Sequence, residues 1–205
     1  MKPDSATIQQ RYDRIAPYFE GLEAIMEGLI FKGWRKKCWA ETKGHHILEV
    51  GVGTGKNFDY YPADARITAI DFSKEMLNRA IQKRTRKNIT VELELMDVQS
   101  LYFADNSFDT VIATFVFCSV PLPLKGLKEL YRVCRPGGQV ILLEHVLSSK
   151  PVLASVMNFI NPAVVALVGA NINRNTVKNV QSCAFSSVHV DERSSDIIKL
   201  IMARK

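Results

Sequence analysis

Three glycines at the spacing G-x-G-x-G follow directly after a short apolar segment, and no other pattern in the chain points as clearly to chemistry. They are Gly51, Gly53 and Gly55, and the apolar segment is residues 46–50. Glycine lets the backbone turn tightly and approach a ligand closely. A second apolar segment ends at Asp71, about 20 residues further on, where a carboxylate can accept hydrogen bonds from a ribose diol. The pattern therefore predicts a site for a cofactor that contains adenosine.

The spacing of the glycines and an acid just before them distinguish between cofactors. A dinucleotide-binding loop has the spacing G-x-G-x-x-G and places a pyrophosphate at the N-terminus of a helix. The present spacing is shorter, and Glu49 lies in the apolar segment that leads into the loop. Its carboxylate would repel a pyrophosphate and would suit a cationic cofactor. Asp97, which follows a third apolar segment, and the turn sequence at 135–138 favour the same interpretation.

The elements that must position these residues alternate along the middle of the chain. Apolar runs predict strands at 46–50, 66–70, 91–95, 111–117 and 140–143, helices at 73–86 and 121–133, and two tail strands at 187–190 and 197–202. Strict alternation of apolar and acidic residues at 91–95 predicts a strand with one face in water, and hence an edge strand. Ser73 is expected to cap its helix. The order predicts an α/β fold with a doubly wound parallel sheet.

A helical lead-in precedes the predicted sheet. Residues 6–43 carry apolar and aromatic side chains at helical spacing. Three glycines are expected to break this segment into shorter helices: Gly21, Gly28 and Gly33. We expect residues 1–43 to form a lead-in or lid and residues 44–205 to form the cofactor-binding part of one compact domain.

A stretch without any charged residue, 151–173, follows the last alternating strand. Its 23 residues are long enough to span a bilayer. Because Asn158, Asn161 and Pro162 lie in its middle and predicted strands flank it, we expect a buried or substrate-facing pair of helices broken at Asn161-Pro162. A lid that contacts a membrane is the alternative.

Composition limits the class of protein. The chain has 205 residues, of which 47% are hydrophobic and 23% charged, and this is typical of one globular domain rather than a disordered or disulfide-framework chain. The four cysteines are scattered without a C-x-x-C pair, which argues against a zinc site and fits a reducing cytoplasm. Residues 1–10 are polar and lack the apolar core of a signal peptide. We therefore expect a cytoplasmic protein without a metal centre.

The net charge of +6 is concentrated in one segment, because residues 74–88 contain six basic residues and one acid. Such a segment can be the solvated face of a helix in an α/β protein. It can also face the phosphates of a nucleic acid or of a membrane surface. We favour the solvated face.

These residues together resemble the class I S-adenosylmethionine-dependent methyltransferases, most strongly between residues 12 and 138. The resemblance implies a Rossmann-like fold with a seven-stranded, mostly parallel sheet. It also implies S-adenosylmethionine as the cofactor and S-adenosylhomocysteine as the product. Orientation of the acceptor in line with the S–CH3 bond would then supply roughly 7–11 kcal/mol of barrier reduction.

The resemblance also implies which residues hold the cofactor. The three glycines would pass under its methionine part while Glu49 braces the loop. Asp71 would hold the ribose hydroxyls, and Asp97 would bind the adenine amino group. The remaining contacts would be Phe72 and Val98 beside the adenine, and Thr114 and Phe115 at the end of the fourth strand.

Several short segments resemble smaller groups within the class. Residues 12–18, 108–109, 120–121 and 129–138 are similar to bacterial phosphatidylethanolamine N-methyltransferases and to ubiquinone/menaquinone-biosynthesis C-methyltransferases. Residues 144–146 and 173–176 are similar to mammalian methyltransferase-like thiol methyltransferases of lipid droplets. These groups share apolar or membrane-derived acceptors, which favours a small-molecule or lipid acceptor and peripheral contact with a membrane. The resemblance leaves the acceptor and the oligomeric state open.

Candidate catalytic residues come from the lead-in and from the fifth strand. If the lead-in folds over the site as in the family, the aromatic rings of Tyr12, Tyr18 and Phe115 would stabilise the sulfonium charge. His145, at the end of the fifth strand, is placed to act as a base toward an acceptor amine, thiol or carbon acid. The alternatives are aromatic residues of the core and a hydrogen-bonded structural histidine.

Other functions are weaker interpretations of the same sequence. A nucleic-acid methyltransferase could use the basic stretch 79–87, but this stretch has no interleaved aromatic residues. The glycine spacing argues against an NAD-dependent oxidoreductase. A protein that binds S-adenosylmethionine without catalysis is the remaining alternative.

Overall fold

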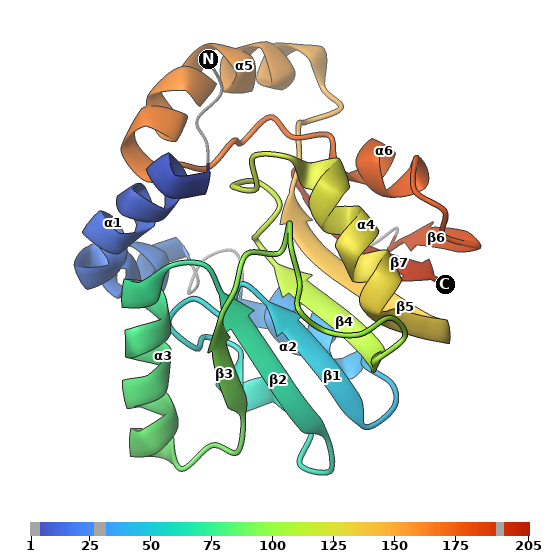
Figure 1. Ribbon diagram of the computed structural model, residues 1–205. Coiled ribbons are helices and arrows are strands. Elements are labelled where there is room, and N and C mark those ends of the chain that lie inside the picture. Colours follow the sequence, from blue (N-terminus) through green and yellow to red (C-terminus); the bar gives the residue numbers. More distant parts are fainter. Residues whose placement is uncertain (1–4, 27–31, 192–194) are drawn as a thin grey trace.

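Figure 1 shows the computed structural model of the chain, which describes residues 5–26, 32–191 and 195–205, with the backbone alone at 18–26, Lys32 and Val168. The strands are β1 (His46–Val50), β2 (Arg66–Asp71), β3 (Glu92–Leu95), β4 (Phe108–Thr114), β5 (Cys134–His145), β6 (Ser187–Val190) and β7 (Ile198–Arg204). The helices are α1 (Ser5–Met26), α2 (Lys32–Ala40), α3 (Lys74–Lys87), α4 (Pro123–Val133), α5 (Pro151–Val168) and α6 (Thr176–Gln181), with a short 3-10 helix at Phe58–Tyr60.

Within the described residues the strands form one seven-stranded sheet in the order β3-β2-β1-β4-β5-β7-β6. The pairs among β1 to β5 are parallel, and β7 is antiparallel to both β5 and β6. This confirms the expected α/β class, with β3 at the predicted edge. Because Val50 of β1 is in register with Ile70 of β2 and Ala113 of β4, these three strands end at the same edge of the sheet.

The two faces of the sheet are covered by different helices, as in a doubly wound fold. Leu48 and Val50 of β1 belong to a buried cluster with Leu127 of α4. Ile47, which points to the opposite face of the same strand, belongs to a cluster with Trp39 of α2 and with side chains of α3. All of these side chains are buried. The hydrophobic effect on both faces therefore fixes the strand ends that the glycine loop follows.

Local signals placed the elements with some errors. Ser73 caps α3 as expected, because its hydroxyl accepts a hydrogen bond from the Met76 amide at 3.2 Å. The turn expected at 135–138 is wrong, since these residues lie within β5, where the register against β4 shifts. Gly137 adopts φ +73°, so the strand absorbs the irregular residues as a bulge.

The lead-in is helical, but the glycines do not divide it as expected. Gly21 lies inside α1 and Gly33 inside α2, while Gly28 lies outside the described residues. A glycine costs a helix only about 1 kcal/mol relative to alanine, which neighbouring helical residues and packing can offset. The prediction of breaks at Gly21 and Gly33 is therefore wrong.

The uncharged segment forms one helix, α5, rather than a broken pair. Pro162 lies inside it, and Gly169 ends it in the left-handed conformation at φ +83°. The segment is also not buried, because most of its outward side chains are exposed. Apolar composition predicted burial, but burial requires a covering element, and α5 has none on its outer face among the described residues. No helix in the described part of the chain is both long and apolar enough to cross a membrane.

Candidate cofactor site

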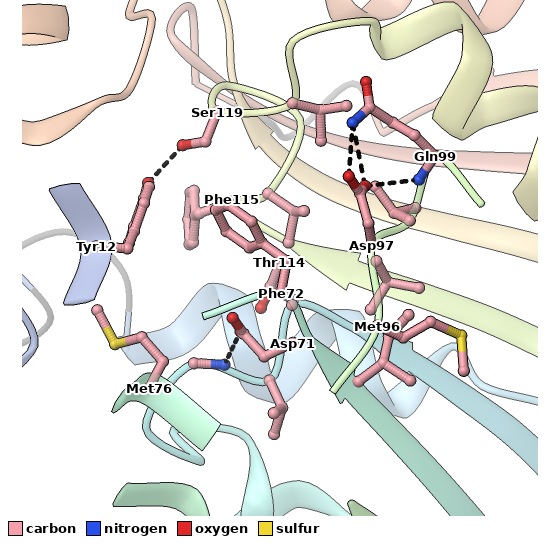
Figure 2. Close-up of a pocket in the computed structure, with 18 of the residues that line it drawn as sticks. Tyr12, Asp71, Phe72, Met76, Met96, Asp97, Gln99, Thr114, Phe115 and Ser119 are labelled. Atoms are coloured by element: carbon pink, nitrogen blue, oxygen red, sulfur yellow. Dashed lines mark hydrogen bonds between the residues drawn. The ribbon is translucent and has the colours of Figure 1, made fainter. Parts of the chain in front are cut away.

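A cavity lies at the carboxyl ends of β1, β2, β3 and β4 and is partly open to solvent. Figure 2 shows many of its lining side chains. The full lining comes from the ends of these strands, from the loops after them and from α1, α2 and α3. Nine of the residues singled out from the sequence line it: Tyr12, Gly51, Gly53, Asp71, Phe72, Asp97, Val98, Thr114 and Phe115.

The glycines of the loop have backbone conformations that residues with a side chain rarely adopt. Gly51, Gly53 and Gly55 have φ values of +72°, +55° and +76°. A Cβ on Gly51 would lie 2.4 Å from a methyl carbon of Val116, whereas a Cβ on Gly53 would have no neighbour within 4 Å. Gly53 therefore presents bare backbone to the cavity, and Gly51 lets the loop pack against the loop after β4. Gly55 packs against Phe58 and does not line the cavity.

Asp71 connects this loop to the end of β2. One carboxylate oxygen accepts a hydrogen bond from the Gly53 amide at 2.8 Å, and the other accepts one from the Ser73 amide at 2.9 Å. The side chain lines the cavity although the residue is only 6% exposed. Burial raises the pKa of Asp71 to about 6, and the amide hydrogen bonds oppose that rise. The carboxylate faces the cavity beside the bare loop backbone (Figure 2).

Glu49 lies behind the loop and not in the cavity. Its carboxylate is fully buried and accepts hydrogen bonds from the Asn57 amide group at 2.6 Å and from the Tyr61 hydroxyl. Burial raises the pKa of Glu49 to about 7. Since Asn57 follows the glycine loop in the chain, these contacts fasten the far end of the loop to β1.

Arg35 of α2 reaches the same region and was not identified from the sequence. Its guanidinium donates to Asn57 at 3.1 Å and to the Thr114 hydroxyl at 2.9 Å, and it lies 5.2 Å from the centre of the Phe115 ring. The residue is 4% exposed and lines the cavity. Phe115 itself has φ +59°, which turns the chain sharply at the end of β4. Arg35 therefore brings a cation to the part of the cavity that Thr114 and Phe115 line.

Asp97 lines the cavity from the loop after β3. Gln99 donates to its carboxylate from the backbone amide at 2.8 Å and from the side chain, and the Ser5 hydroxyl of α1 donates at 3.0 Å. Met96 and Val98, the neighbours of Asp97 in the chain, also line the cavity. The loop after β3 therefore contributes one acid and two apolar side chains to the lining.

Helix α1 closes the cavity from above. The Tyr12 hydroxyl shares a hydrogen bond with the Ser119 hydroxyl, and its ring meets the Phe72 ring edge-on at 5.7 Å between centroids. Asp13 accepts a hydrogen bond from the Ser73 hydroxyl at 2.6 Å. With the Ser5–Asp97 contact, α1 is attached to the loops after β2, β3 and β4. The side chain of Tyr18 lies outside the described residues.

His145 lies at the end of β5 but is not among the described residues that line the cavity. Burial lowers its pKa, and a hydrogen bond with the Ile172 backbone partly opposes this. Successive strand residues point to opposite faces. The side chain of the preceding residue, Glu144, points toward the loop after β4. There it accepts hydrogen bonds from the Val116 and Phe117 amides at 2.9 and 3.0 Å. This placement gives no support to His145 as a base.

Other expected features can be located as well. The basic residues of α3 lie on a partly to fully exposed helix face, and of that helix only Met76 lines the cavity. Across the described ranges, histidine, cysteine and acidic side chains form no group of three that could hold a metal ion. Cavity residues missed from the sequence include Ser5, Arg35, Lys56, Gln99 and Ser119. Fold position after β4 could have identified Ser119, whereas nothing in a helical segment pointed to Arg35.

Comparisons with known proteins agree on the class of fold and cofactor. Residues 48–142 match the family model described as a methyltransferase domain. The chain is 41% identical over 124 residues to a phosphatidylethanolamine N-methyltransferase of Cereibacter sphaeroides, and this match covers 60% of the chain and 61% of that relative. It is 31% identical over 173 residues to the ubiquinone/menaquinone biosynthesis C-methyltransferase UbiE of Bdellovibrio bacteriovorus, covering 82% of the chain and 74% of the relative.

A solved structure has the same fold over the full length of the chain. It is an S-adenosylmethionine-dependent methyltransferase of Thermotoga maritima, with a TM-score of 0.71 and 17% identity, and the match covers 97% of this chain and 99% of that one. At this identity the likeness concerns the fold.

Proposed function

The chain belongs to the class I S-adenosylmethionine-dependent methyltransferases, and we propose that it transfers the methyl group to an apolar small-molecule or lipid acceptor. The observation that supports an apolar acceptor is the wall between α1 and the loop after β4. Five of its cavity-lining side chains are aromatic or apolar: Tyr12, Phe115, Val116, Val120 and Pro121. The polar groups of Tyr12 and Ser119 on this wall are hydroxyls, which suit an acceptor with a neutral polar end.

The residues present fit the cofactor from end to end. The bare backbone at Gly53 leaves room that a side chain would fill, and the Asp71 carboxylate beside it can accept hydrogen bonds from the ribose hydroxyls. We place the adenine at Asp97, between Val98 and Phe72, with the methionine sulfonium toward Thr114 and Phe115. The positive charge of Arg35 then lies at the end where the methionine carboxylate would be.

S-adenosylmethionine supplies an electrophilic methyl group when bound. The chain contributes orientation, exclusion of water and stabilisation of positive charge. The Tyr12 and Phe115 rings line the cavity and can face the sulfonium, while the Tyr12–Ser119 hydroxyl pair can hold a polar end of the acceptor. Because His145 does not line the cavity, we assign it no proton transfer and keep Tyr12 as the positioning residue.

We further propose that residues 1–43 act as a lid on the domain formed by 44–205. The support is the set of three contacts by which α1 touches the loops after β2, β3 and β4: Asp13–Ser73, Ser5–Asp97 and Tyr12–Ser119. Opening of α1 would expose the cavity, and closing it would exclude water. All four cysteines are free and three are buried, which supports a reducing compartment such as the cytoplasm.

The test is release of S-adenosylhomocysteine with a panel of acceptors: phosphatidylethanolamine in vesicles, a demethylated quinone, an alkyl thiol and a short RNA. We expect release with one apolar acceptor and none with RNA, and loss of turnover in the Ser119→Ala variant at unchanged cofactor affinity. Release with RNA alone would refute the proposal. Cofactor binding without release from any acceptor would favour a protein that binds S-adenosylmethionine without catalysis.

A further inference from the structure

The outer face of α5 is apolar over its whole length and uncovered by the described chain. Figure 1 shows α5 beside α1, beyond the carboxyl ends of the central strands. One side of the helix carries side chains at helical spacing that define the α5 face: Val152, Val156, Phe159, Ala163 and Leu167, flanked by Leu153 and Ile160. Val152, Phe159 and Leu167 are 81%, 87% and 74% exposed. Contiguous exposed apolar surface of this kind marks an interaction site.

Hydrogen bonds made by two asparagines of α5 and by Arg11 fix the orientation of the helix. The side-chain oxygen of Asn161 accepts a hydrogen bond from the Ile172 backbone amide at 2.9 Å. The side-chain oxygen of Asn158 accepts one from the side-chain amide of Asn173 at 2.9 Å. Arg11 of α1 donates to the Val165 carbonyl at 2.7 Å. These contacts anchor the helix to the segment that follows it and to α1. Rotation that would bury the α5 face would break all of them.

Among the charged side chains that the structure describes near the α5 face, three are basic and two are acidic. Residues 151–173 carry no charge, Lys150 precedes the helix and is exposed, and Arg11 and Arg14 lie one turn apart on α1, which packs against α5. Two acids lie nearby. Asp13 accepts a hydrogen bond from Ser73 on the α3 side, and Asp196 accepts hydrogen bonds from the hydroxyls of Ser148 and Ser149 beside Lys150.

We propose that the α5 face binds the surface of a membrane that contains anionic lipid. An interfacial helix places its apolar face at the boundary of headgroups and acyl chains, and flanking cations attract the anionic headgroups. A second copy of the chain fits less well, because a symmetric contact through α5 would bring the basic residues of both copies together. This inference rests on the proposed apolar acceptor. The end of α5 supplies the connection, since a Cβ on Gly169 would lie 3.6 Å from the ring of Tyr12, which lines the cavity.

The experiment is sedimentation of the full chain with vesicles of phosphatidylcholine alone or mixed with phosphatidylglycerol, without cofactor or acceptor. The test variant is Val152→Ser with Phe159→Ser. The matched control is Tyr102→Ser, which removes an aromatic side chain that is 83% exposed elsewhere on the surface. We expect the test variant to lower vesicle binding by about tenfold or more, and the control to leave it unchanged. Arg14→Gln should weaken binding to the mixed vesicles and leave binding to phosphatidylcholine unchanged.

Other outcomes would overturn the inference. They are absence of vesicle binding, equal binding by wild type and test variant, and a concentration-dependent dimer in ultracentrifugation that the test variant abolishes. Binding of S-adenosylhomocysteine by each variant, measured by calorimetry, shows that the fold is intact. Because the vesicle assay needs no turnover, failure of methyl transfer and failure of membrane binding give separate results.

Discussion

Asp71 offers the sharpest test of where the cofactor lies. Its two carboxylate oxygens each accept one backbone amide, from Gly53 and from Ser73, and the side chain lines the cavity. Asp71→Asn keeps the shape and removes the charge. The amide group of asparagine must turn its own donor toward one of the two backbone amides, so the variant also loses one hydrogen bond of the loop. A change in cofactor affinity alone would therefore combine two effects: the lost charge toward the ligand and the lost hydrogen bond within the loop.

A comparison of two ligands separates these effects. A hydrogen bond to a charged acceptor contributes about 1.5–3 kcal/mol and one to a neutral acceptor about 1 kcal/mol. Wild type should therefore prefer S-adenosylhomocysteine over its 2′-deoxy analogue by about 10- to 100-fold. In Asp71→Asn that preference should fall to about fivefold, because the hydroxyl then meets a neutral oxygen. The loop effect cancels, since both ligands experience it.

Isothermal calorimetry on wild type, Asp71→Asn and Asp97→Asn provides the measurement. Asp97 lies at the proposed adenine end, so Asp97→Asn should weaken both ligands and keep the wild-type preference. The reasoning would be refuted if Asp71→Asn discriminated between the two ligands as strongly as wild type. If Asp97→Asn instead lost the preference for S-adenosylhomocysteine over its 2′-deoxy analogue, the cofactor would lie in the cavity in the opposite orientation.

The pH dependence of binding follows from the same carboxylate. Burial raises the pKa of Asp71 to about 6 in the protein without cofactor. Because the ribose hydroxyls donate to the ionised form, affinity should be constant above about pH 7 and fall below about pH 6, by at most about tenfold per pH unit. Asp71→Asn should lack this part of the fall. An identical pH profile in wild type and variant would show that Asp71 does not titrate against the ligand.

Three further predictions concern stability and the lid. Burial raises the pKa of Glu144 to about 7. The folded state therefore retains a proton that the unfolded state loses above about pH 4.5. Because of this difference, the free energy of unfolding should fall as pH rises from about 5 to 8. Glu144→Gln should flatten that fall in urea unfolding, and an unchanged slope would contradict the assignment. Gly51→Ala places a methyl group 2.4 Å from Val116 at φ +72°. It should cost about 1–3 kcal/mol of unfolding free energy and weaken cofactor binding. A variant as stable as wild type would show that the loop can shift to make room for the methyl group. Deletion of residues 1–20 should preserve the circular dichroism of the sheet and abolish turnover, and full activity would exclude a lid.

The sequence was sufficient to predict the site residues that follow directly from apolar strand patterns and from their position at the ends of those strands. Apolar runs that end in Gly51, Asp71 and Asp97 predicted both the strands and the edge at which these residues meet, because parallel strands present their carboxyl ends at one edge. Side-chain direction was less accessible. His145 ends β5 without lining the cavity, and the alternation along β5 points Glu144 instead toward the loop after β4.

Residues outside this alternation could not be placed from pattern alone. Arg35 reaches the cavity because α2 packs on the sheet and directs the guanidinium to Thr114 at the end of β4, and no local signal in a basic, amphipathic helix reveals that packing. The uncharged stretch 151–173 shows the converse. Its composition indicated burial, yet α5 presents an apolar face outward because its few polar side chains are needed to hold the segment that follows.

Three buried acids hold the loops at the carboxyl edge of the sheet. Asp71 is the last residue of β2, and Glu49 and Glu144 are the last but one of β1 and β5. Burial raises the pKa of Glu49, Asp71 and Glu144 to about 7, 6 and 7. The charge on Asp71 adds to the rise at Glu49. Of the three, Asp71 lines the cavity, so a positive charge bound there would favour its ionised form. Each acid also fastens the loops around the cavity: Glu49 holds Asn57, Asp71 holds Gly53, and Glu144 holds Val116. The same carboxylates therefore shape the loops around the cavity, and Asp71 also contributes its own charge to the lining.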